Sequence, residues 1–144
     1  EAGAVADSFD WVHTVAGERA ARRLSARRAP AAADLMTCIQ LRPEGAPERS
    51  GVEASEVPPL AELIERLPNI RLRGLMMMPL PGLTTAGVRA EFARTRAVLE
   101  KLRDAGHHAD TLSMGMSGDL EAAIMEGSTL VRVGTDIFGP RNHD

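Results

Sequence analysis

The sequence is poor in several reactive side chains. Its 144 residues include no tyrosine, one lysine at position 101 and one cysteine at position 38. One cysteine cannot form an internal disulfide, and Cys38 lies inside an apolar run, so we expect a buried, inert thiol rather than a nucleophile. No Cys/His cluster has the spacing of metal ligands. These absences argue against a disulfide framework or a metal site and favour a reducing cytoplasm.

Neither charge nor hydropathy indicates a large partner. The net charge is −3 and the pI is about 5.8, which gives no general reason to expect nucleic acid or an anionic membrane. The longest nearly apolar run, residues 74–83, is interrupted by Pro79 and Pro81. It is far shorter than the ~20 residues that span a bilayer. We also expect no signal peptide.

Two polar features have a structural interpretation. His13 shares a strand face with Trp11, and we expect a packed, hydrogen-bonded histidine, with a role in a site as the alternative. A helix expected at residues 18–28 has no aromatic residues between its arginines, so we expect a solvated outer face rather than a nucleic-acid patch. Those arginines are Arg19, Arg22, Arg23, Arg27 and Arg28.

Short apolar segments typical of strands alternate with segments in which apolar residues have helical spacing. At 44% hydrophobic and 26% charged residues, the chain suits one globular domain. We expect strands at residues 9–15, 35–41, 70–78, 111–114 and 129–133. We expect helices at residues 18–28, 55–67, 84–105 and between Ser117 and Gly127. Residues 1–8 are expected to be the tail of an earlier helix. Five strands alternating with four helices predict parallel βα units and an α/β fold.

Residues 111–141 hold the most specific pattern. Gly115 is expected to end a strand, and Ser117 stands where the N-cap of the next helix belongs. In a (β/α)8 barrel the loops after strands 7 and 8, with a helix N-terminus, form the usual phosphate site. Ser117 and Gly134-Thr135 occupy those two loops if the chain is the end of such a barrel. The alternative is that Ser117 only caps its helix and Gly134 only turns the chain.

A complete barrel of this kind needs eight strands and about 250 residues, so roughly three units are missing. Because the last two expected strands look like strands 7 and 8, we place the deficit at the N-terminus, and a start at Glu1 rather than Met agrees with this. We therefore predict that residues 1–144 form the C-terminal portion, about the last five strands, of a (β/α)8 TIM barrel.

An incomplete barrel has exposed edges. The strands at residues 9–15 and 129–133 would each present an unpaired edge, and inward side chains such as Met76 and Met114 would face a gap. We expect a missing N-terminal segment or self-association to cover them.

Residues 112–124, Leu-Ser-Met-Gly-Met-Ser-Gly-Asp-Leu-Glu-Ala-Ala-Ile, and residues 127–139, Gly-Ser-Thr-Leu-Val-Arg-Val-Gly-Thr-Asp-Ile-Phe-Gly, form one extended motif. It closely resembles the signature of the YggS/PROSC family of pyridoxal 5′-phosphate (PLP) homeostasis proteins. Supporting matches are Phe-Asp-Trp-Val-His-Thr at 9–14, Arg-Ser-Gly at 49–51 and Arg-Gly-Leu-Met at 73–76. Because several long matches occur in order, the resemblance is specific.

The resemblance implies a fold like the N-terminal barrel of bacterial alanine racemases, with PLP at the C-terminal ends of the strands. Ser117, Gly134 and Thr135 would hold the phosphate, Arg132 would lie near the pyridine nitrogen, and Met116 would line the site. A cationic partner keeps that nitrogen unprotonated and weakens the electron sink on which PLP enzymes depend. The resemblance therefore implies a carrier or regulator rather than a catalyst.

The chain also departs from the family. The Schiff-base lysine of the family lies on the first strand, which is absent here, and Lys101 belongs to a helix expected on the outside of the barrel. PLP would therefore bind non-covalently.

Two other functions stay open: a fragment of a PLP-dependent amino-acid racemase, and a phosphate-binding barrel fragment with a different ligand. Racemisation typically needs an opposed lysine and tyrosine, and this chain has no tyrosine and no lysine in an eligible position. A serine hydrolase is rejected because Asp119 replaces the last glycine of G-x-S-x-G and no ordered Asp and His follow.

Overall fold

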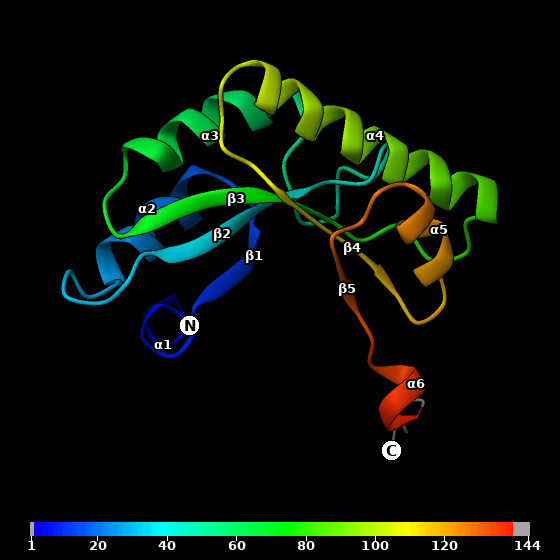
Figure 1. Ribbon diagram of the computed structural model, residues 1–144, viewed down its shortest axis with the longest axis horizontal. Helices are drawn as coiled ribbons and strands as arrows, with labels where there is room; N and C mark the ends of the chain where they lie inside the picture. The colour runs from blue at the N-terminus through cyan, green and yellow to red at the C-terminus, as the bar shows by residue number, and fades with distance from the viewer. Residues whose placement is uncertain (1, 140–144) are drawn as a thin grey trace.

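The computed structural model describes residues 2–139, which form alternating strands and helices (Figure 1). The elements are α1 (Ala2–Ser8), β1 (Trp11–Val15), α2 (Glu18–Arg27), β2 (Leu35–Leu41), the 3-10 helix η1 (Ala54–Glu56), α3 (Val57–Arg66), β3 (Ile70–Met77), α4 (Thr85–Asp104), β4 (Thr111–Met116), α5 (Leu120–Met125), β5 (Leu130–Arg132) and α6 (Thr135–Phe138). Every expected strand and helix is present. Helix α6 is an addition, because Gly134-Thr135 was expected to form only a turn.

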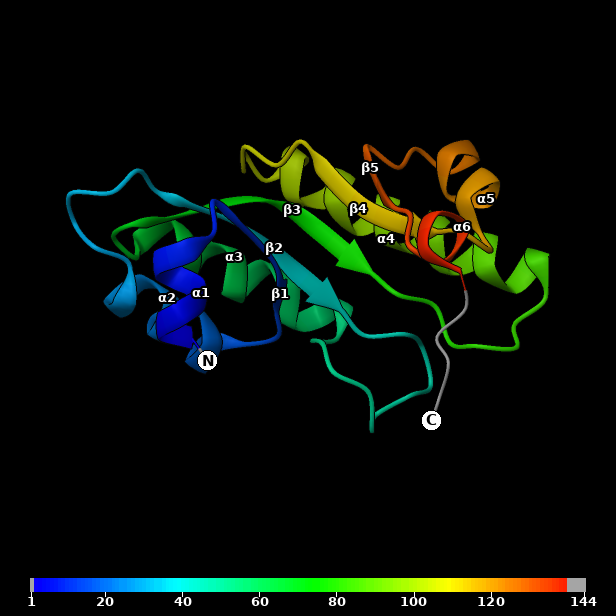
Figure 2. The ribbon, with the colours of Figure 1, turned by 90° about the horizontal axis from the view of Figure 1, so that it is seen from below.

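The five strands form one parallel sheet in the order β1-β2-β3-β4-β5. The strands run side by side in the same direction and the sheet curls, with α3 and α4 over its upper face (Figures 1 and 2). Sequential parallel strands joined by helices are the arrangement of a partial (β/α)8 barrel. The predicted fold class is therefore confirmed.

The helix-covered face of the sheet holds the hydrophobic core. Every second strand residue points toward the helices, as the two-residue period of a strand requires. On β3 these residues are Ile70 and Leu72 and then, after an irregularity in the β2–β3 register that shifts the alternation by one residue, Leu75 and Met77. All four belong to one core cluster with Phe92 of α4. Strand β2 is buried along nearly its whole length, as expected for a parallel strand covered on both faces.

The opposite face, which we call the inner face, is more polar. It carries Trp11 and His13 from β1, Gln40 from β2, Arg73 from β3 and Ser113 from β4. The curl of the sheet brings its far strands together there, since His13 Nδ1 lies 2.8 Å from Ser113 Oγ. Met76 and Cys38 fill the space between and are buried.

Two glycines permit the close approach of neighbouring elements. A Cβ at Gly74 would lie 1.8 Å from the carbonyl oxygen of Thr111, its partner across the β3–β4 pair. Gly115 has φ of 102°, and a Cβ there would lie 2.6 Å from Cβ of Ala123 in α5. The expectation that Gly115 ends the strand was wrong, because β4 continues through it to Met116.

Two further expectations were wrong. Met76 and Met114 do not face a gap: they are 2% and 0% exposed, because the sheet curls and Met114 points toward the helices. Arg28 is not on a solvated face either. Its side chain is buried, and it donates to the carbonyl oxygens of Ala6, Phe9 and Ala33. Arg28 thus ties α1 to the end of α2.

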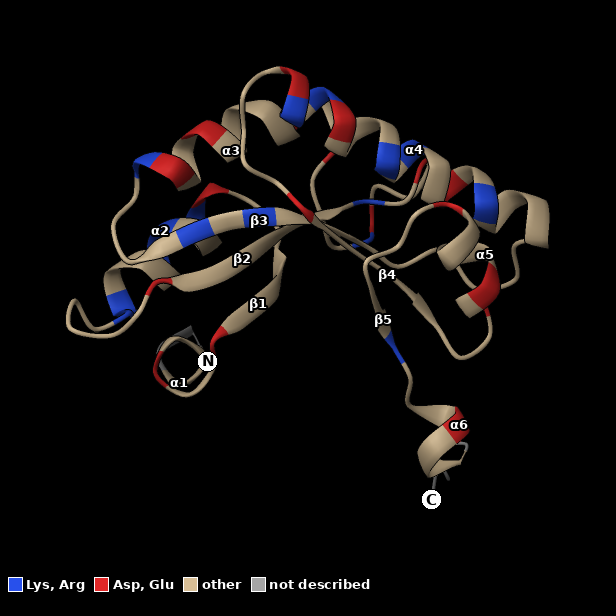
Figure 3. Ribbon diagram, viewed as in Figure 1, with Lys and Arg blue, Asp and Glu red and all other residues tan. Residues whose placement is uncertain are grey.

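Charged residues lie mostly on the helices and loops, whereas the strands are largely uncharged except on β3 and β5 (Figure 3). No helix in residues 2–139 is long and apolar enough to cross a membrane. The same residues contain no group of three or more His, Cys, Asp or Glu side chains that could hold a metal ion.

Candidate functional site

The loop after β4 is a tight turn at residues 116–119. The backbone N–H of Met116 donates to Asp119 Oδ1 at 2.6 Å, and the N–H of Asp119 donates back to the Met116 carbonyl at 3.1 Å. Asp119, not Ser117, precedes the first residue of α5 and makes no side-chain cap bond. The expectation that Ser117 caps this helix was wrong, because the turn uses two more residues before the helix begins. The hydroxyl of Ser117 is therefore directed elsewhere.

The hydroxyl of Ser117 joins this loop to the loop after β5. Its Oγ accepts a hydrogen bond from the backbone N–H of Asp136 at 3.3 Å. Asp136 lies in α6, which begins at Thr135 directly after Gly134. The structure thus brings Ser117 and Gly134-Thr135 together at the C-terminal ends of β4 and β5. We call Ser117, Gly118, Gly134 and Thr135 the cup.

The cup offers unused hydrogen-bond donors. Within residues 2–139, the backbone N–H groups of Gly118, Gly134 and Thr135 have no hydrogen-bond acceptor. A Cβ at Gly118 or Gly134 would meet no atom within 4 Å, so open space lies beside both. Backbone N–H groups without acceptors, next to a hydroxyl and beside open space, are the kind of donors that a small oxyanion takes.

Arg132, the last residue of β5, reaches from the cup side across the inner face. Its Nη1 donates to the carbonyl oxygen of Ser113 at 3.0 Å and also to Ser113 Oγ, and its Nη2 donates to the Met77 carbonyl at 3.2 Å. The side chain is half-buried, and this burial lowers the pKa of Arg132 from its ordinary value. An arginine stays charged even so, so Arg132 places a fixed cation on the inner face between β4 and β3.

The residues behind Arg132 include one that the motif did not single out. Ser113 is fully buried and accepts from Arg132, while His13 holds the same hydroxyl from β1. The expectation that His13 is a packed, hydrogen-bonded histidine is confirmed. A serine in the middle of an otherwise apolar strand was the available signal for Ser113.

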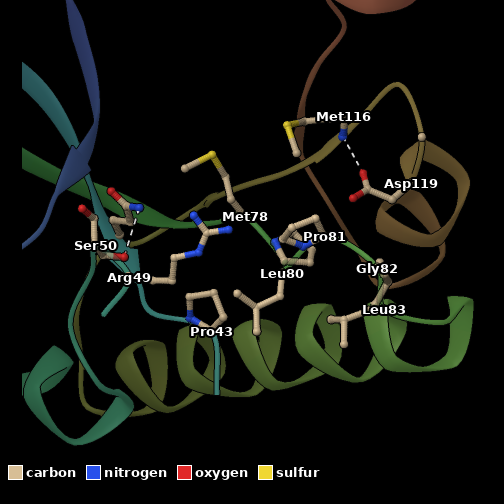
Figure 4. Close-up of a pocket in the computed structure, with 14 residues that line it drawn as sticks. Pro43, Arg49, Ser50, Met78, Leu80, Pro81, Gly82, Leu83, Met116 and Asp119 are labelled. Atoms are coloured by element: carbon tan, nitrogen blue, oxygen red, sulfur yellow. Dashed lines mark hydrogen bonds between the residues drawn. The ribbon is translucent and has the colours of Figure 1, made fainter. Parts of the chain in front are cut away.

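Met116 is about one-third exposed and borders a cavity of about 520 Å³ next to the cup. Gly118 and Asp119 form the adjoining wall, and Arg49 extends over the cavity from the β2–α3 loop (Figure 4). The remaining walls are mainly apolar, with Pro43, Met78, Leu80, Pro81 and Leu83 among them. A ligand held in the cup would have room for an apolar body here.

The other candidate reactive residues lie apart from the cup. Lys101 is exposed in the last turn of α4, as expected for a helix on the outside of a barrel. Cys38 is fully buried, as expected, and burial raises the pKa of its thiol to about 12. His107, just after α4, has its Nδ1 2.9 Å from Glu65 Oε1.

Comparison with protein families gives one match over nearly the whole chain. Residues 1–142 match the model described as alanine racemase, N-terminal domain. The chain is 47% identical over 139 residues to the pyridoxal phosphate homeostasis protein of Pseudomonas aeruginosa, covering 96% of this chain and 59% of that protein. It is 44% identical over 141 residues to the protein of the same name in Escherichia coli K12, with the same coverage. The chain thus spans about three-fifths of the length of these relatives.

The chain is also similar in fold to solved structures. PipY of Synechococcus elongatus, solved without PLP, superposes with a TM-score of 0.88 at 31% identity, covering 96% of this chain and 65% of that one. The PipY structure with PLP bound gives a TM-score of 0.85. A protein from Bifidobacterium adolescentis gives 0.87 at 31% identity, with 95% and 56% covered.

Proposed function

The chain belongs to the alanine racemase N-terminal domain family, and on that premise we propose that it binds PLP non-covalently and takes part in PLP homeostasis. The observation that carries the proposal is the hydrogen bond from Asp136 N–H to Ser117 Oγ. It joins the two loops, so that the unused donors of both lie at the same end of the sheet. A phosphate group needs several N–H and O–H donors at one point, and the cup supplies them.

The cup and the cavity next to it together have room for more than a phosphate group. Open space beside Gly118 and Gly134 admits the phosphate, and the neighbouring cavity is lined largely by apolar side chains. In this proposal Met116 lines the ring site and Arg132 donates to the pyridine nitrogen. PLP supplies an electron sink when its pyridine nitrogen is protonated. Arg132, which can only donate, keeps that nitrogen unprotonated.

The same residues favour binding over catalysis. Lys101, the one lysine of the chain, is on an outer helix, and the chain has no tyrosine. No side chain of the described residues therefore stands ready as the lysine or tyrosine that a PLP racemase uses. We propose a carrier or regulator of PLP. The relatives named pyridoxal phosphate homeostasis protein support this role.

A partner for the sheet edges belongs to the proposal. In the described sheet β1 pairs only with β2, and β5 pairs only with β4, so each has one open edge. We propose that an N-terminal segment carrying further strands, or a second copy of the chain, covers these edges. Light scattering after size-exclusion chromatography tests this, and a compact monomer with a cooperative thermal transition and no partner would refute it.

Thermal protection by ligand tests the cup. PLP and inorganic phosphate should each raise the melting temperature of the chain. Thr135→Ala removes a hydroxyl expected to bind the phosphate, so it should reduce both shifts with little change in unliganded stability. Ser117→Ala should reduce them as well and also lower unliganded stability slightly, since it breaks the bond between the loops. Ser55→Ala, at an exposed hydroxyl in η1, is the control.

The outcomes distinguish the possible ligands. Equal protection of both variants and the parent would place the phosphate elsewhere. Protection by inorganic phosphate without further gain from PLP would favour a phosphate-bearing ligand with a different body, such as a phosphosugar.

A further inference from the structure

Ser113 sets the orientation of the Arg132 guanidinium. Two of the three hydrogen bonds that Arg132 makes go to this residue, one to its carbonyl oxygen at 3.0 Å and one to its Oγ. Ser113 is fully buried in β4, so water does not compete for its hydroxyl group. The planar guanidinium is therefore held at Nη1 by Ser113 and at Nη2 by the carbonyl oxygen of Met77.

Ser113 is held in turn by a residue 100 positions earlier in the chain. His13 Nδ1 of β1 lies 2.8 Å from Ser113 Oγ. Because arginine can only donate, Ser113 Oγ accepts from Arg132, and its single hydroxyl proton is available for His13 Nδ1. This direction of donation requires a neutral His13 with its proton on Nε2. Burial first, and the charge of Arg132 second, lower the pKa of His13 and favour that neutral form.

The imidazole is itself fixed from its other side. The Trp11 ring meets it edge to face, with 5.8 Å between centroids and 70° between planes. The guanidinium of Arg73 lies 4.6 Å from the centroid of the Trp11 ring, and Arg73 binds both carboxylate oxygens of Asp110, at 3.1 and 2.7 Å. These contacts form a continuous chain along the inner face that ends at Arg132.

We infer that His13 and Ser113 are positioning residues, which fix the guanidinium of Arg132 at the ring end of the PLP site. Arg132 donates a hydrogen bond to Ser113, and Ser113 donates one to His13. The inference rests on the proposed function for the role of Arg132. Its physical basis is preorganisation: a long, flexible side chain that is already ordered loses less entropy when it binds. Both residues lie behind Arg132 and would act through it.

The first test uses the chain without ligand. Long-range ¹H–¹⁵N NMR of the imidazoles should show His13 Nδ1 as an unprotonated acceptor at neutral pH, assigned by its loss in His13→Asn. Ser113→Ala should shift this Nδ1 signal and leave His107 and His108 unchanged. A protonated Nδ1 in the parent would overturn the direction of donation and with it the inference.

The second test separates the ring end from the phosphate end. Ser113→Ala should weaken PLP binding about tenfold, as expected for the loss of one hydrogen bond to a charged group, and leave the affinity for inorganic phosphate unchanged. His13→Phe keeps a ring but removes the acceptor, so it should act in the same direction. His13→Asn places an amide oxygen close to the position of Nδ1 and should retain most of the affinity. Thr95→Val, which removes a buried hydroxyl in α4, is the control.

Each result decides one question. If Ser113→Ala weakens PLP and phosphate equally, or neither, the positioning role is wrong. If His13→Asn loses as much affinity as His13→Phe, the acceptor at Nδ1 has no role and the inference fails. If the parent binds neither PLP nor phosphate, the proposed function fails, and the NMR result alone decides whether the donation from Ser113 to His13 exists.

Discussion

The two faces of the sheet are built from alternate residues of the same strands and have different tasks. Toward the helices, Leu75 and Met77 pack with Phe92 in a continuous apolar core. Toward the inner face, Ser113 and Arg132 are connected by directed hydrogen bonds. Apolar packing is non-directional and tolerates small shifts, whereas hydrogen bonds fix orientation. The helix-side face thus holds the fold together, and the inner face holds one cation in place.

The largest effect should come from the helix-side face. Phe92→Ala removes a fully buried ring from the core and should lower the free energy of unfolding by about 3–5 kcal/mol. Ser113→Ala on the inner face should cost only about 1 kcal/mol. Urea denaturation of the two variants beside the parent measures the difference. Similar losses would mean that the inner face is as important for stability as the core.

The second effect concerns the β3–β4 contact. Gly74→Ala would drive a Cβ into the Thr111 carbonyl and should cost at least the ~1–3 kcal/mol typical of overpacking, because backbone cannot move aside as a side chain can. Gly118→Ala, whose Cβ meets open space, should leave stability nearly unchanged. Thermal unfolding of the pair provides the check, and a stable Gly74→Ala variant would contradict the close β3–β4 pairing.

A smaller effect should appear on acidification. The pKa of His13 is lowered, so the unfolded chain takes up its proton at a higher pH than the folded chain does. Stability should therefore fall as the pH drops below the ordinary histidine value of about 6.5. His13→Phe should remove this loss, whereas substitution of the exposed His108 by Gln should preserve it. Urea midpoints at pH 7.5 and 5.5 measure it.

A second acid transition should follow at lower pH. The hydrogen bonds from Arg73 hold the pKa of Asp110 below its ordinary value. The stability that this pair contributes is present above the unfolded pKa and is lost as the pH falls through the folded one. Asp110→Asn should remove only this second loss of stability and leave the loss caused by His13 in place.

The smallest expected effect is none at all. Borohydride should not fix PLP in the site, because Lys101 lies on the outer face of α4. Mass spectrometry after reduction should find no PLP adduct that depends on Ser117. An adduct on Lys101 that disappears in Ser117→Ala would contradict non-covalent binding.

Local patterns were enough for the fold and for the loops of the cup. The period of the strands and the glycines between them predicted five parallel βα units. The motif at residues 112–139 predicted Ser117, Gly134 and Thr135 as a phosphate site, which stays a prediction. The structure brings these residues together. Short spacing suffices here because the two loops follow neighbouring strands of a parallel sheet.

What the sequence did not predict depends on curvature and on contacts between distant residues. The meeting of His13 with Ser113 requires the sheet to curl until β1 reaches β4, and no local pattern records that. The same curl buries Met76, which was expected to face a gap. Gly115 was interpreted as a strand end, yet its lack of a Cβ serves the approach of Ala123 within a continuing strand. Ser117 was expected to cap α5, but the turn before that helix takes up two more residues. The Ser117 hydroxyl therefore bonds the N–H of Asp136 instead.

The most direct measurement of the central claim is a ¹⁵N–¹H NMR titration of the chain with PLP. The backbone amides of Gly118, Gly134 and Thr135, which have no acceptor within residues 2–139, should shift downfield together as they donate to the phosphate. Inorganic phosphate should move the same three amides, and PLP should in addition move the side-chain signals of Arg132. Shifts that cluster elsewhere while these three amides stay in place would contradict the account.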